Sequence, residues 1–345
     1  MAAVPILFIT SSRIGDAVLS SGLVRALAEE IPQARFTIVG SALTVPLFAD
    51  TPGLARLIAL EKRPLGLHWL DLWRQTRGRT WGLVVDLRGT AISGLLRRKR
   101  RAVWRPGPGG AHKVVEASRL LKLETPAAPF LYTSAATEAR AAALTAGEGP
   151  ILAVAPAANW IGKTWPAERY ATVIRALLGP GGALAGGRLM LLGGAADRRA
   201  ADGLRATARR DGLIDLVGRV PLLVSYAALK RARLFVGADS GLMHLAAAAG
   251  APTLGLFGPS DERLYGPWGE TARSLRGPRS FETIRAADPN LDLAVCHMMD
   301  LAAPRVIAAA EALVADTRPA PPAPSPPPPP PARRRKKKAA DAEEL

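Results

Sequence analysis

Short apolar runs alternate with amphipathic stretches along most of this 345-residue chain. The clearest unit is VGADSGLMHLAAAAGAPTLGLFGPS at residues 236–260, in which an apolar run stops at Asp239 and a helix of small residues ends at Gly250. A second apolar run begins after Pro252. Alternation of strands and helices produces a parallel sheet with helices on both faces. The pattern therefore predicts an α/β fold.

Two series of such units are separated by a Gly- and Pro-containing break at residues 147–150. The first series has predicted strands at 6–10, 36–40, 83–86 and 103–104 and helices at 17–30, 112–121 and 135–143; the second has strands at 151–155 and 188–192 and helices at 167–178 and 195–210. We expect two Rossmann-like, doubly wound domains with a cleft between them. The expected limits are 1–147 for the first domain and 148–316 for the second, which includes a closing helix.

The composition limits the class of protein. Cys296 is the single cysteine, so a disulfide framework and a cysteine-rich metal site are excluded, and a reducing compartment is expected. No run of about 18 uncharged apolar residues is present, so we expect no membrane-spanning helix. The N-terminal MAAVPILFIT lacks a basic region before its apolar run, which favours a buried strand over a signal peptide.

The chain is strongly basic, with 46 Lys and Arg residues against 29 Asp and Glu residues and a net charge of +17. Residues 61–120 alone hold 14 basic and 4 acidic residues. Such a field attracts nucleic acid, an anionic membrane surface or a phosphorylated substrate, or it is simply a solvated basic surface. Aromatic residues make up only 5% of the chain and no recognised nucleic-acid motif is present, so nucleic acid is the less favoured partner.

The C-terminal segment 317–345 differs from the rest of the chain. It contains PAPPAPSPPPPPPARRRKKK, in which proline removes backbone donors and six consecutive basic residues repel one another. We expect this tail to be disordered. It is either a solvated appendage or a contact between Arg333–Lys338 and a membrane surface or nucleic acid.

Ligands of doubly wound sheets bind outside the carboxyl ends of the strands, so each strand-to-helix turn is a candidate site. The first turn, TSSRIGD, ends at Asp16, which either caps the next helix or points into the cleft as a general base. The second turn, PAANWIGKTWP, carries Lys163, which is either an anchored cation for a phosphate or a loop lysine in water. The third, LLGGAAD, ends at Asp197, which either accepts a ribose hydroxyl or caps a helix.

The fourth turn begins the helix of the 236–260 unit. A helix N-terminus presents unpaired N–H groups and a partial positive charge, which suit a phosphate or a diphosphate. Gly241 leaves room for the anion, and Ser240 adds a hydroxyl donor. His244 lies on the first turn of the same helix, either as a buried structural residue or as a hydrogen-bond donor to a departing phosphate. This order of elements predicts a binding site for a phosphate or a diphosphate.

The same turn resembles the signature of a known family. DSGLMHLAAA at 239–248, followed by Pro252 and by LFGPSD at 256–261, is similar to the signature of glycosyltransferase family 9, the ADP-heptose:lipopolysaccharide heptosyltransferases. Three more segments agree in order and spacing, namely SRIGD at 12–16, DLRG at 86–89 and KTWP at 163–166. The resemblance covers about residues 5–315.

This resemblance implies two Rossmann-like domains in the GT-B arrangement, with the acceptor bound by the first domain and the nucleotide sugar by the second. Asp16 matches the catalytic base of the family, and Lys163 matches its diphosphate-contacting lysine. The other positions implied for the nucleotide sugar are Asn159, Asp197, Asp239, Ser240, Gly241 and His244. The basic region 61–120 then gains a role, in which Lys62, Arg63, Arg88 and Arg97 face the acceptor.

The expected function is an inverting, metal-independent transfer of a heptosyl residue from ADP-heptose to an anionic, lipid-linked lipopolysaccharide acceptor, without a cofactor. The expected location is the cytoplasm, at the cytoplasmic face of the inner membrane, which the basic charge would attract. Two alternatives stay open. A nucleotide-sugar epimerase would use the same nucleotide cleft without a lipid-linked acceptor, and a nucleic-acid-binding protein would use the basic charge alone.

Overall fold

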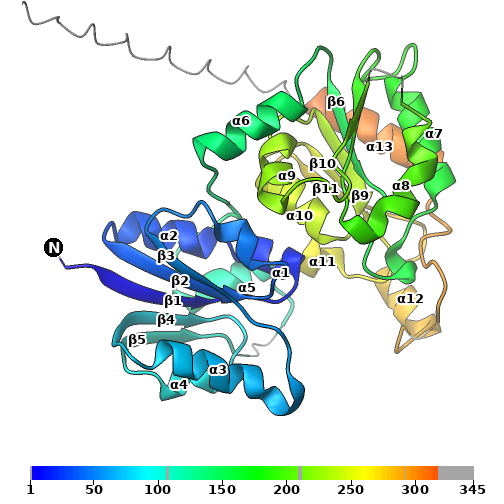
Figure 1. The fold of residues 1–345 in the computed structure, drawn as a ribbon. Coiled ribbons are helices and arrows are strands. Elements are labelled where there is room, and N and C mark those ends of the chain that lie inside the picture. Colours follow the sequence, from blue (N-terminus) through cyan, green and yellow to red (C-terminus); the bar gives the residue numbers. More distant parts are fainter. Residues whose placement is uncertain (1, 106–108, 209–211, 292, 318–345) are drawn as a thin grey trace, which may run out of the picture.

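The structure is a computed structural model that describes residues 2–105, 109–208, 212–291 and 293–317. It contains two α/β bodies, each built on one parallel sheet (Figure 1). The predicted α/β fold with two doubly wound sheets is therefore confirmed. From residue 318 onward, the tail expected to be disordered lies outside the described residues. The division into domains at residues 147 and 148 stays a prediction.

The first sheet has the strand order β3-β2-β1-β4-β5. Its strands are β1 (Val4–Ile9), β2 (Ala34–Gly40), β3 (Leu54–Ala59), β4 (Trp81–Asp86) and β5 (Arg98–Val103). The chain moves outward from β1 to β3 and then returns to place β4 on the other side of β1. The topological switch point of this sheet therefore lies between β1 and β4, where ligands of doubly wound sheets bind.

The second sheet has the order β11-β10-β9-β6-β7-β8. Its strands are β6 (Ile151–Ala155), β7 (Arg188–Leu191), β8 (Leu213–Asp215), β9 (Leu234–Ala238), β10 (Thr253–Phe257) and β11 (Ala272–Arg276). Here the chain moves outward from β6 to β8 and returns to place β9 beside β6. The second switch point therefore lies between β6 and β9.

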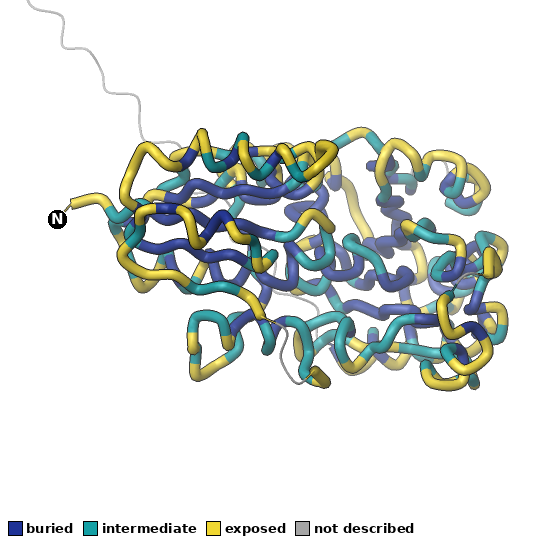
Figure 2. The backbone as a smooth tube through the Cα atoms, turned by 90° about the horizontal axis from the view of Figure 1, so that it is seen from below, coloured by how far each residue is buried: buried dark blue, intermediate teal, exposed yellow. Residues whose placement is uncertain are grey.

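Alternate residues of each strand supply two apolar layers, because successive strand side chains point to opposite faces. In β1, Ile6 and Phe8 pack with α1 (Ile14–Leu19) and α2 (Gly22–Glu30). Leu7 and Ile9 pack with α3 (Leu67–Thr76) and α4 (Ile92–Leu95) on the other face. Figure 2 shows the strands as the buried part of the chain and the outward helices and loops as the exposed part.

The second sheet is covered in the same way. α9 (Leu222–Leu229) and α10 (Gly241–Ala248) pack on one face. The other face is covered by α7 (Ala167–Leu178), α8 (Arg198–Arg205) and α13 (Ala303–Asp316). The remaining elements are the helices α5 (Lys113–Leu120), α6 (Ala135–Leu144), α11 (Glu262–Tyr265) and α12 (Phe281–Ala287) and the 3-10 turns η1 (Val45–Phe48), η2 (Pro64–Gly66), η3 (Ile161–Lys163) and η4 (Ala195–Asp197).

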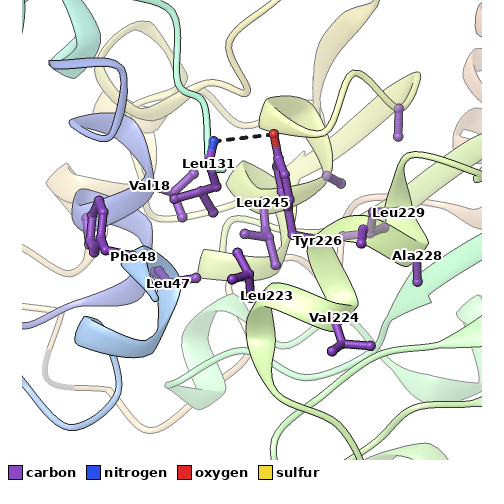
Figure 3. Close-up of a cluster of buried hydrophobic side chains, with 14 of the residues drawn as sticks. Val18, Leu47, Phe48, Leu131, Leu223, Val224, Tyr226, Ala228, Leu229 and Leu245 are labelled. Atoms are coloured by element: carbon purple, nitrogen blue, oxygen red, sulfur yellow. Dashed lines mark hydrogen bonds between the residues drawn. The ribbon is translucent and has the colours of Figure 1, made fainter. Parts of the chain in front are cut away.

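A continuous apolar cluster joins the two bodies. Figure 3 shows Val18 of α1 and Leu47 and Phe48 of η1 on the side of the first sheet, close to Leu223 of α9 and Leu245 of α10. α6, which precedes the second sheet in the chain, also packs against α9. Buried apolar contact of this kind holds the bodies in a defined relative position, and that position brings the two switch points together.

Three predicted elements differ from the observed ones. The helix expected at 17–30 is divided into α1 and α2, because the hydroxyls of Ser20 and Ser21 donate to the carbonyls of Asp16 (2.8 Å) and Val18 (2.6 Å) and compete with the helical ladder. The strand expected at 103–104 is the end of the longer β5. The helix expected at 195–210 consists of η4 and the shorter α8.

Two elements, α3 and β5, lie in stretches that look polar in the sequence. β5 is an edge strand, and its middle residues Lys99, Arg100 and Arg101 are exposed. Charged side chains suit an edge strand because they oppose pairing with another chain. α3 buries only a narrow stripe of His68, Leu72 and Thr76.

Candidate active site

The N-termini of α1 and α10 meet where the two bodies face each other. A Cβ atom added to Gly241 would lie 2.7 Å from Cγ2 of Ile14, and one added to Gly15 would lie 3.0 Å from Cδ2 of His244. These glycines therefore allow a close approach that larger residues would prevent. The turn after β1 and the turn after β9 consequently form one site.

Lys163 and Asp239 lie on the turns that flank the switch point of the second sheet, after β6 and β9. Nζ of Lys163 is 2.5 Å from Oδ2 of Asp239, and the two side chains are 26% and 8% exposed. The interpretation of Lys163 as a loop lysine in water is therefore wrong. An ion pair this deeply placed restricts the ammonium group to one position at the mouth of α10.

Asp16 is in the first turn of α1 but does not cap it. The helix begins at Ile14, its N-cap residue is Arg13, and no side chain makes a capping hydrogen bond there. The capping interpretation is therefore wrong. Oγ of Ser11 donates to Oδ2 of Asp16 at 3.4 Å. Burial raises the pKa of the Asp16 carboxyl, although Arg13 opposes this effect, and a raised pKa makes a carboxylate a better proton acceptor.

His244 is buried in the contact between the two helix N-termini. Burial lowers the pKa of its imidazole to about 4, so the ring is neutral at pH 7. Its Nε2 is 3.7 Å from Oδ1 of Asp239, and its Nδ1 has no hydrogen-bond partner in the described part of the chain. Oγ of Ser240 is likewise buried without a partner among the described residues. These two polar atoms at the helix mouth are therefore able to form hydrogen bonds with an anionic ligand.

A cavity of about 190 Å³ lies beside Asp16. Its lining residues are Ser11, Asp16, Leu19, Ser20, Leu87, Trp104, Lys113, Glu116 and Ala117. Trp104, Lys113 and Glu116 were not singled out from the sequence. Trp104 directly follows β5, and Lys113 and Glu116 lie on the helix after it, so the rule that ligands bind at the carboxyl ends of strands could have found them.

His112 connects the two bodies beside this cavity. Its Nδ1 accepts a hydrogen bond from the N–H of Val114 at 3.2 Å, and its Nε2 therefore donates to the carbonyl of Gly266 at 2.9 Å. The ring also contacts Trp268 in a tilted arrangement, with 4.9 Å between the ring centroids. Burial lowers the pKa of His112, which favours this neutral, bridging form.

The DLRG segment at 86–89 is a turn held by its own first residue. The carboxylate of the buried Asp86 accepts hydrogen bonds from the N–H groups of Arg88 (3.0 Å) and Thr90 (2.8 Å) and from the Thr90 hydroxyl (2.7 Å). Gly89 has a φ of +64°, which glycine adopts without strain. The turn therefore places Leu87 in the cavity wall and Arg88 at the carboxyl end of β4.

The other basic residues expected to face the acceptor are separated by the fold. Lys62 and Arg63 follow β3 at the same edge of the sheet as Asp16, and Arg63 forms an ion pair with Asp71 at 2.6 Å. The guanidinium of Arg88 lies 4.7 Å from the centroid of the Trp69 ring. Arg97 precedes β5 and therefore lies at the opposite, amino-terminal edge of the sheet. The structure does not bring Arg97 together with Asp16.

The two remaining residues expected to bind the nucleotide sugar lie on turns of the second sheet. Asn159 is exposed on the turn after β6. Oδ2 of Asp197, on the turn after β7, accepts a hydrogen bond from the N–H of Gly194 at 2.7 Å, so this carboxylate does shape its own turn. The turn after β6 also carries Lys163, and the turn after β7 emerges beside it at the carboxyl end of the adjacent strand.

No group of three or more His, Cys, Asp and Glu residues is arranged to hold a metal ion in the part of the chain that the structure describes. Over the same residues, no helix has the length and apolar character that crossing a membrane requires.

Comparison with known proteins identifies the family. A family model described as glycosyltransferase family 9 (heptosyltransferase) matches residues 82–290, which is more than half of the chain. The chain belongs to glycosyltransferase family 9. The resemblance noted in the sequence is thereby confirmed, and the chain is a glycosyltransferase. Family membership also favours this interpretation over an epimerase or a nucleic-acid-binding protein.

Individual relatives are similar to this chain along most of their length. Lipopolysaccharide heptosyltransferase 2 of Salmonella typhimurium is 26% identical over 325 residues, covering 82% of this chain and 91% of that protein. The solved structure of a family 9 glycosyl transferase from Veillonella parvula has a TM-score of 0.75 at 18% identity and covers 92% of this chain and 99% of that one. ADP-heptose LPS heptosyltransferase II of Escherichia coli has a TM-score of 0.68 at 22% identity, with coverages of 91% and 99%. These structures support the fold with two facing sheets.

Proposed function

We propose that this family 9 enzyme transfers a heptosyl residue from ADP-heptose to a hydroxyl of a phosphorylated, lipid-linked lipopolysaccharide core acceptor, with inversion at the anomeric carbon. The relatives named as lipopolysaccharide heptosyltransferases support this choice of donor and acceptor. One structural observation carries the proposal. The close approach of Gly15 in α1 to His244 in α10 brings the turn that carries the partly buried Asp16 next to a helix N-terminus suited to a diphosphate.

In the proposed reaction, Asp16 accepts the proton of the acceptor hydroxyl. The hydroxyl oxygen forms a bond to the anomeric carbon as the bond from that carbon to the diphosphate oxygen breaks, through a state with oxocarbenium character. The electron pair of the broken bond goes to ADP. The N–H groups at the start of α10, the hydroxyl of Ser240 and the ammonium of Lys163 stabilise the charge that develops on the diphosphate.

Asp239 has a positioning role in this proposal. Its carboxylate holds the ammonium of Lys163 at 2.5 Å, at the mouth of α10. A lysine fixed in this way loses less conformational freedom when the diphosphate arrives than a mobile lysine would. Asn159 and Asp197, on adjacent turns, are proposed to contact the rest of the nucleotide sugar, and Lys62, Arg63 and Arg88 the anionic groups of the acceptor.

We also propose peripheral attachment to the cytoplasmic face of an anionic membrane, through the segment between β3 and α3. Leu65 is 98% exposed there and has a φ of +53°, a strained conformation for leucine that holds the side chain in solvent. Leu67 and Leu70 are also exposed, and Lys62 and Arg63 precede them. Exposed apolar side chains beside basic ones suit a surface with anionic headgroups above an apolar interior.

The catalytic part of the proposal is tested with Asp16→Asn. The variant should bind ADP as the parent does, but its turnover with ADP-heptose should fall by about 10²-fold to 10⁴-fold, because an amide cannot accept the proton. Burial raises the folded-state pKa of Asp16, which means that the folded protein favours the neutral carboxyl over the carboxylate. The stability that the neutral form contributes is lost as the pH rises through that pKa. Asp16→Asn should therefore melt at or above the parental temperature at neutral pH.

Asp202→Asn is the matched control, because Asp202 is an exposed residue of α8 in a surface ion pair with Arg205. It should retain parental turnover. Near-parental turnover of Asp16→Asn would contradict the assignment of Asp16 as the base. Loss of ADP binding in that variant would show that Asp16 also contributes to the ADP site.

A further inference from the structure

The cavity beside Asp16 is lined by an ion pair, Lys113–Glu116, that has no role in the proposed reaction. Nζ of Lys113 lies 2.7 Å from Oε2 of Glu116, one turn further along α5, and both side chains are mostly buried. Nζ of Lys113 also lies 5.6 Å from the centroid of the Tyr265 ring, which belongs to α11 in the other body. The pair is therefore fixed at the junction of the two bodies, next to the proposed base.

The charges that line this cavity do not favour an anion. The lining contains two carboxylates, Asp16 and Glu116, and one ammonium, Lys113, which already has Glu116 as its partner. A carboxylate or phosphate placed here would face two like charges and would compete for the single ammonium group. The hydroxyl groups of an uncharged sugar fit the same lining, because each can donate to a carboxylate and accept from the ammonium.

An aromatic surface completes the cavity. Trp104 lines it and is 36% exposed, and Leu19, Leu87 and Ala117 supply further apolar area. A pocket with apolar walls and a few convergent polar groups is typical of small-molecule sites. The apolar C–H face of a pyranose ring suits the Trp104 ring, while its hydroxyls suit the polar end of the cavity.

Resting on the proposed function, we infer that this cavity is the subsite for the acceptor residue that receives the transferred sugar, and that this residue is an uncharged pyranose. Glu116 and Lys113 bind its hydroxyls and so present one of them to Asp16. The anionic groups of the acceptor lie outside the cavity, toward Lys62, Arg63 and Arg88 on the turns after β3 and β4. Glu116 is then the residue that discriminates against a sugar with a carboxylate on its ring.

The inference is tested with two soluble oligosaccharides that share their inner residues and differ in the terminal one. One ends in a neutral heptopyranose, and the other ends in an ulosonic acid, which carries a ring carboxylate. Binding of each to the full-length chain with ADP present is measured by titration calorimetry, and heptosyl transfer from ADP-heptose is measured separately. The parent should bind the neutral acceptor at least about 10-fold more tightly than the carboxylate-bearing one, because the cavity carboxylates repel the carboxylate of the second acceptor.

Glu116→Gln should reduce this preference by about 10-fold, because it removes one of the two opposing charges and keeps the shape of the side chain. The matched control is Glu138→Gln, since Glu138 forms a similar ion pair with Lys230 at 2.6 Å on α6, away from the cavity. That control should keep the parental preference. Trp104→Ala should weaken binding of the neutral acceptor several-fold, and Trp104→Phe should restore most of it.

Equal or tighter binding of the carboxylate-bearing acceptor by the parent would overturn the inference, as would a preference that Glu116→Gln leaves unchanged. Melting temperatures near the parental value exclude misfolding as the cause of any effect. The two measurements keep the inference distinct from the proposed function. Selective binding of the neutral acceptor without any heptosyl transfer would contradict the proposed function alone, and transfer without selectivity would contradict the subsite alone.

Discussion

The imidazole of His244 is neutral at pH 7 because burial lowers its pKa to about 4. An unfolded chain would protonate the same ring near pH 6.5. The neutral form fits its position beside the Lys163 ammonium, whose positive charge also lowers the pKa of His244. At the scale of single residues, the positive charge of the proposed site thus comes from Lys163 and from the start of α10, and His244 packs there as an uncharged group.

This assignment predicts how stability depends on pH. The folded-state pKa of His244 is below the unfolded value, so its stabilising contribution is present above pH 6.5 and is lost as the pH falls toward 4. The loss should be on the order of 3 kcal/mol. His244→Gln cannot be protonated in this range, so its melting temperature should fall less than that of the parent between pH 7.5 and pH 5. Parallel curves for the two proteins would show that His244 is not the titrating group.

The Lys163–Asp239 pair makes a second prediction at this scale. Lys163→Met should weaken ADP binding, and it should also destabilise the fold by about 1–3 kcal/mol, because it leaves the buried Asp239 carboxylate without its partner. The double variant Lys163→Met/Asp239→Asn should regain the melting temperature but not the affinity for ADP. Recovery of ADP affinity in the double variant would show that Lys163 does not bind the diphosphate.

At the scale of elements, the decisive contact is the one between α1 and α10. Each helix begins at the switch point of its own sheet, and the two N-termini approach closely because glycines stand at positions 15 and 241. Helix packing therefore sets the position of the proposed base relative to the proposed leaving-group site. Small displacements of the reacting groups in such an arrangement reduce the rate strongly.

Gly241→Ala tests this contact. The added methyl group would lie 2.7 Å from Cγ2 and 2.8 Å from Cβ of Ile14, so α1 must move away from α10. Turnover should fall by at least about 10-fold. Gly203→Ala is the control, because a Cβ atom at Gly203 on α8 meets nothing within 4 Å. It should keep parental turnover and be more stable by about 0.5–1 kcal/mol, since alanine favours the helix. Unchanged turnover in Gly241→Ala would show that the reaction tolerates a wider spacing.

At the scale of the whole molecule, the two bodies share one buried apolar cluster and also make polar contacts, some beside the proposed site and some away from it. His112 joins α5 to Gly266, and Lys230 of the second body pairs with Glu138 of α6. The exposed Leu65, between β3 and α3, and the exposed Leu67 and Leu70 of α3 lie on the first body, which also carries the proposed acceptor cavity. A membrane docked at this segment would be on the side of the molecule that receives a lipid-linked substrate.

Binding to anionic vesicles can distinguish a membrane contact made by Leu65 from one made by the basic tail. Leu65→Asn should reduce binding at both low and raised salt, because it removes the apolar anchor, and asparagine tolerates the positive φ of this position. Deletion of residues 318–345 should reduce binding at low salt only, since salt screens the charge of Arg333–Lys338. Leu144→Asn, at an exposed leucine of α6, is the control and should bind as the parent does.

Each of these vesicle variants should retain parental transfer to a soluble acceptor, because the proposed site consists of other residues. If Leu65→Asn binds vesicles as the parent does, the segment between β3 and α3 does not contact the membrane. A large loss of transfer to soluble acceptor on deletion of 318–345 would show that this segment contributes to the reaction itself.

The sequence by itself determined the α/β fold, the family and the turns that carry the site, because these depend on local signals. β6 at Ile151–Ala155 and α7 at Ala167–Leu178 were predicted to the residue, since each has a clear apolar period and a Gly or Pro near its boundary. Asp16, Lys163 and Asp239 were singled out because they lie on strand-to-helix turns and match the motifs of family 9.

Only the tertiary structure decided what these residues contact. The pairing of Lys163 with Asp239 joins residues 76 positions apart, and the contact of Gly15 with His244 joins two separate sheets. Nothing in the local pattern encodes such distances, which follow from strand order and from the apolar packing between the bodies. Trp104 and the Lys113–Glu116 pair follow a run of arginines that reads as a solvated surface, and only the pairing of β5 with β4 brings them beside Asp16.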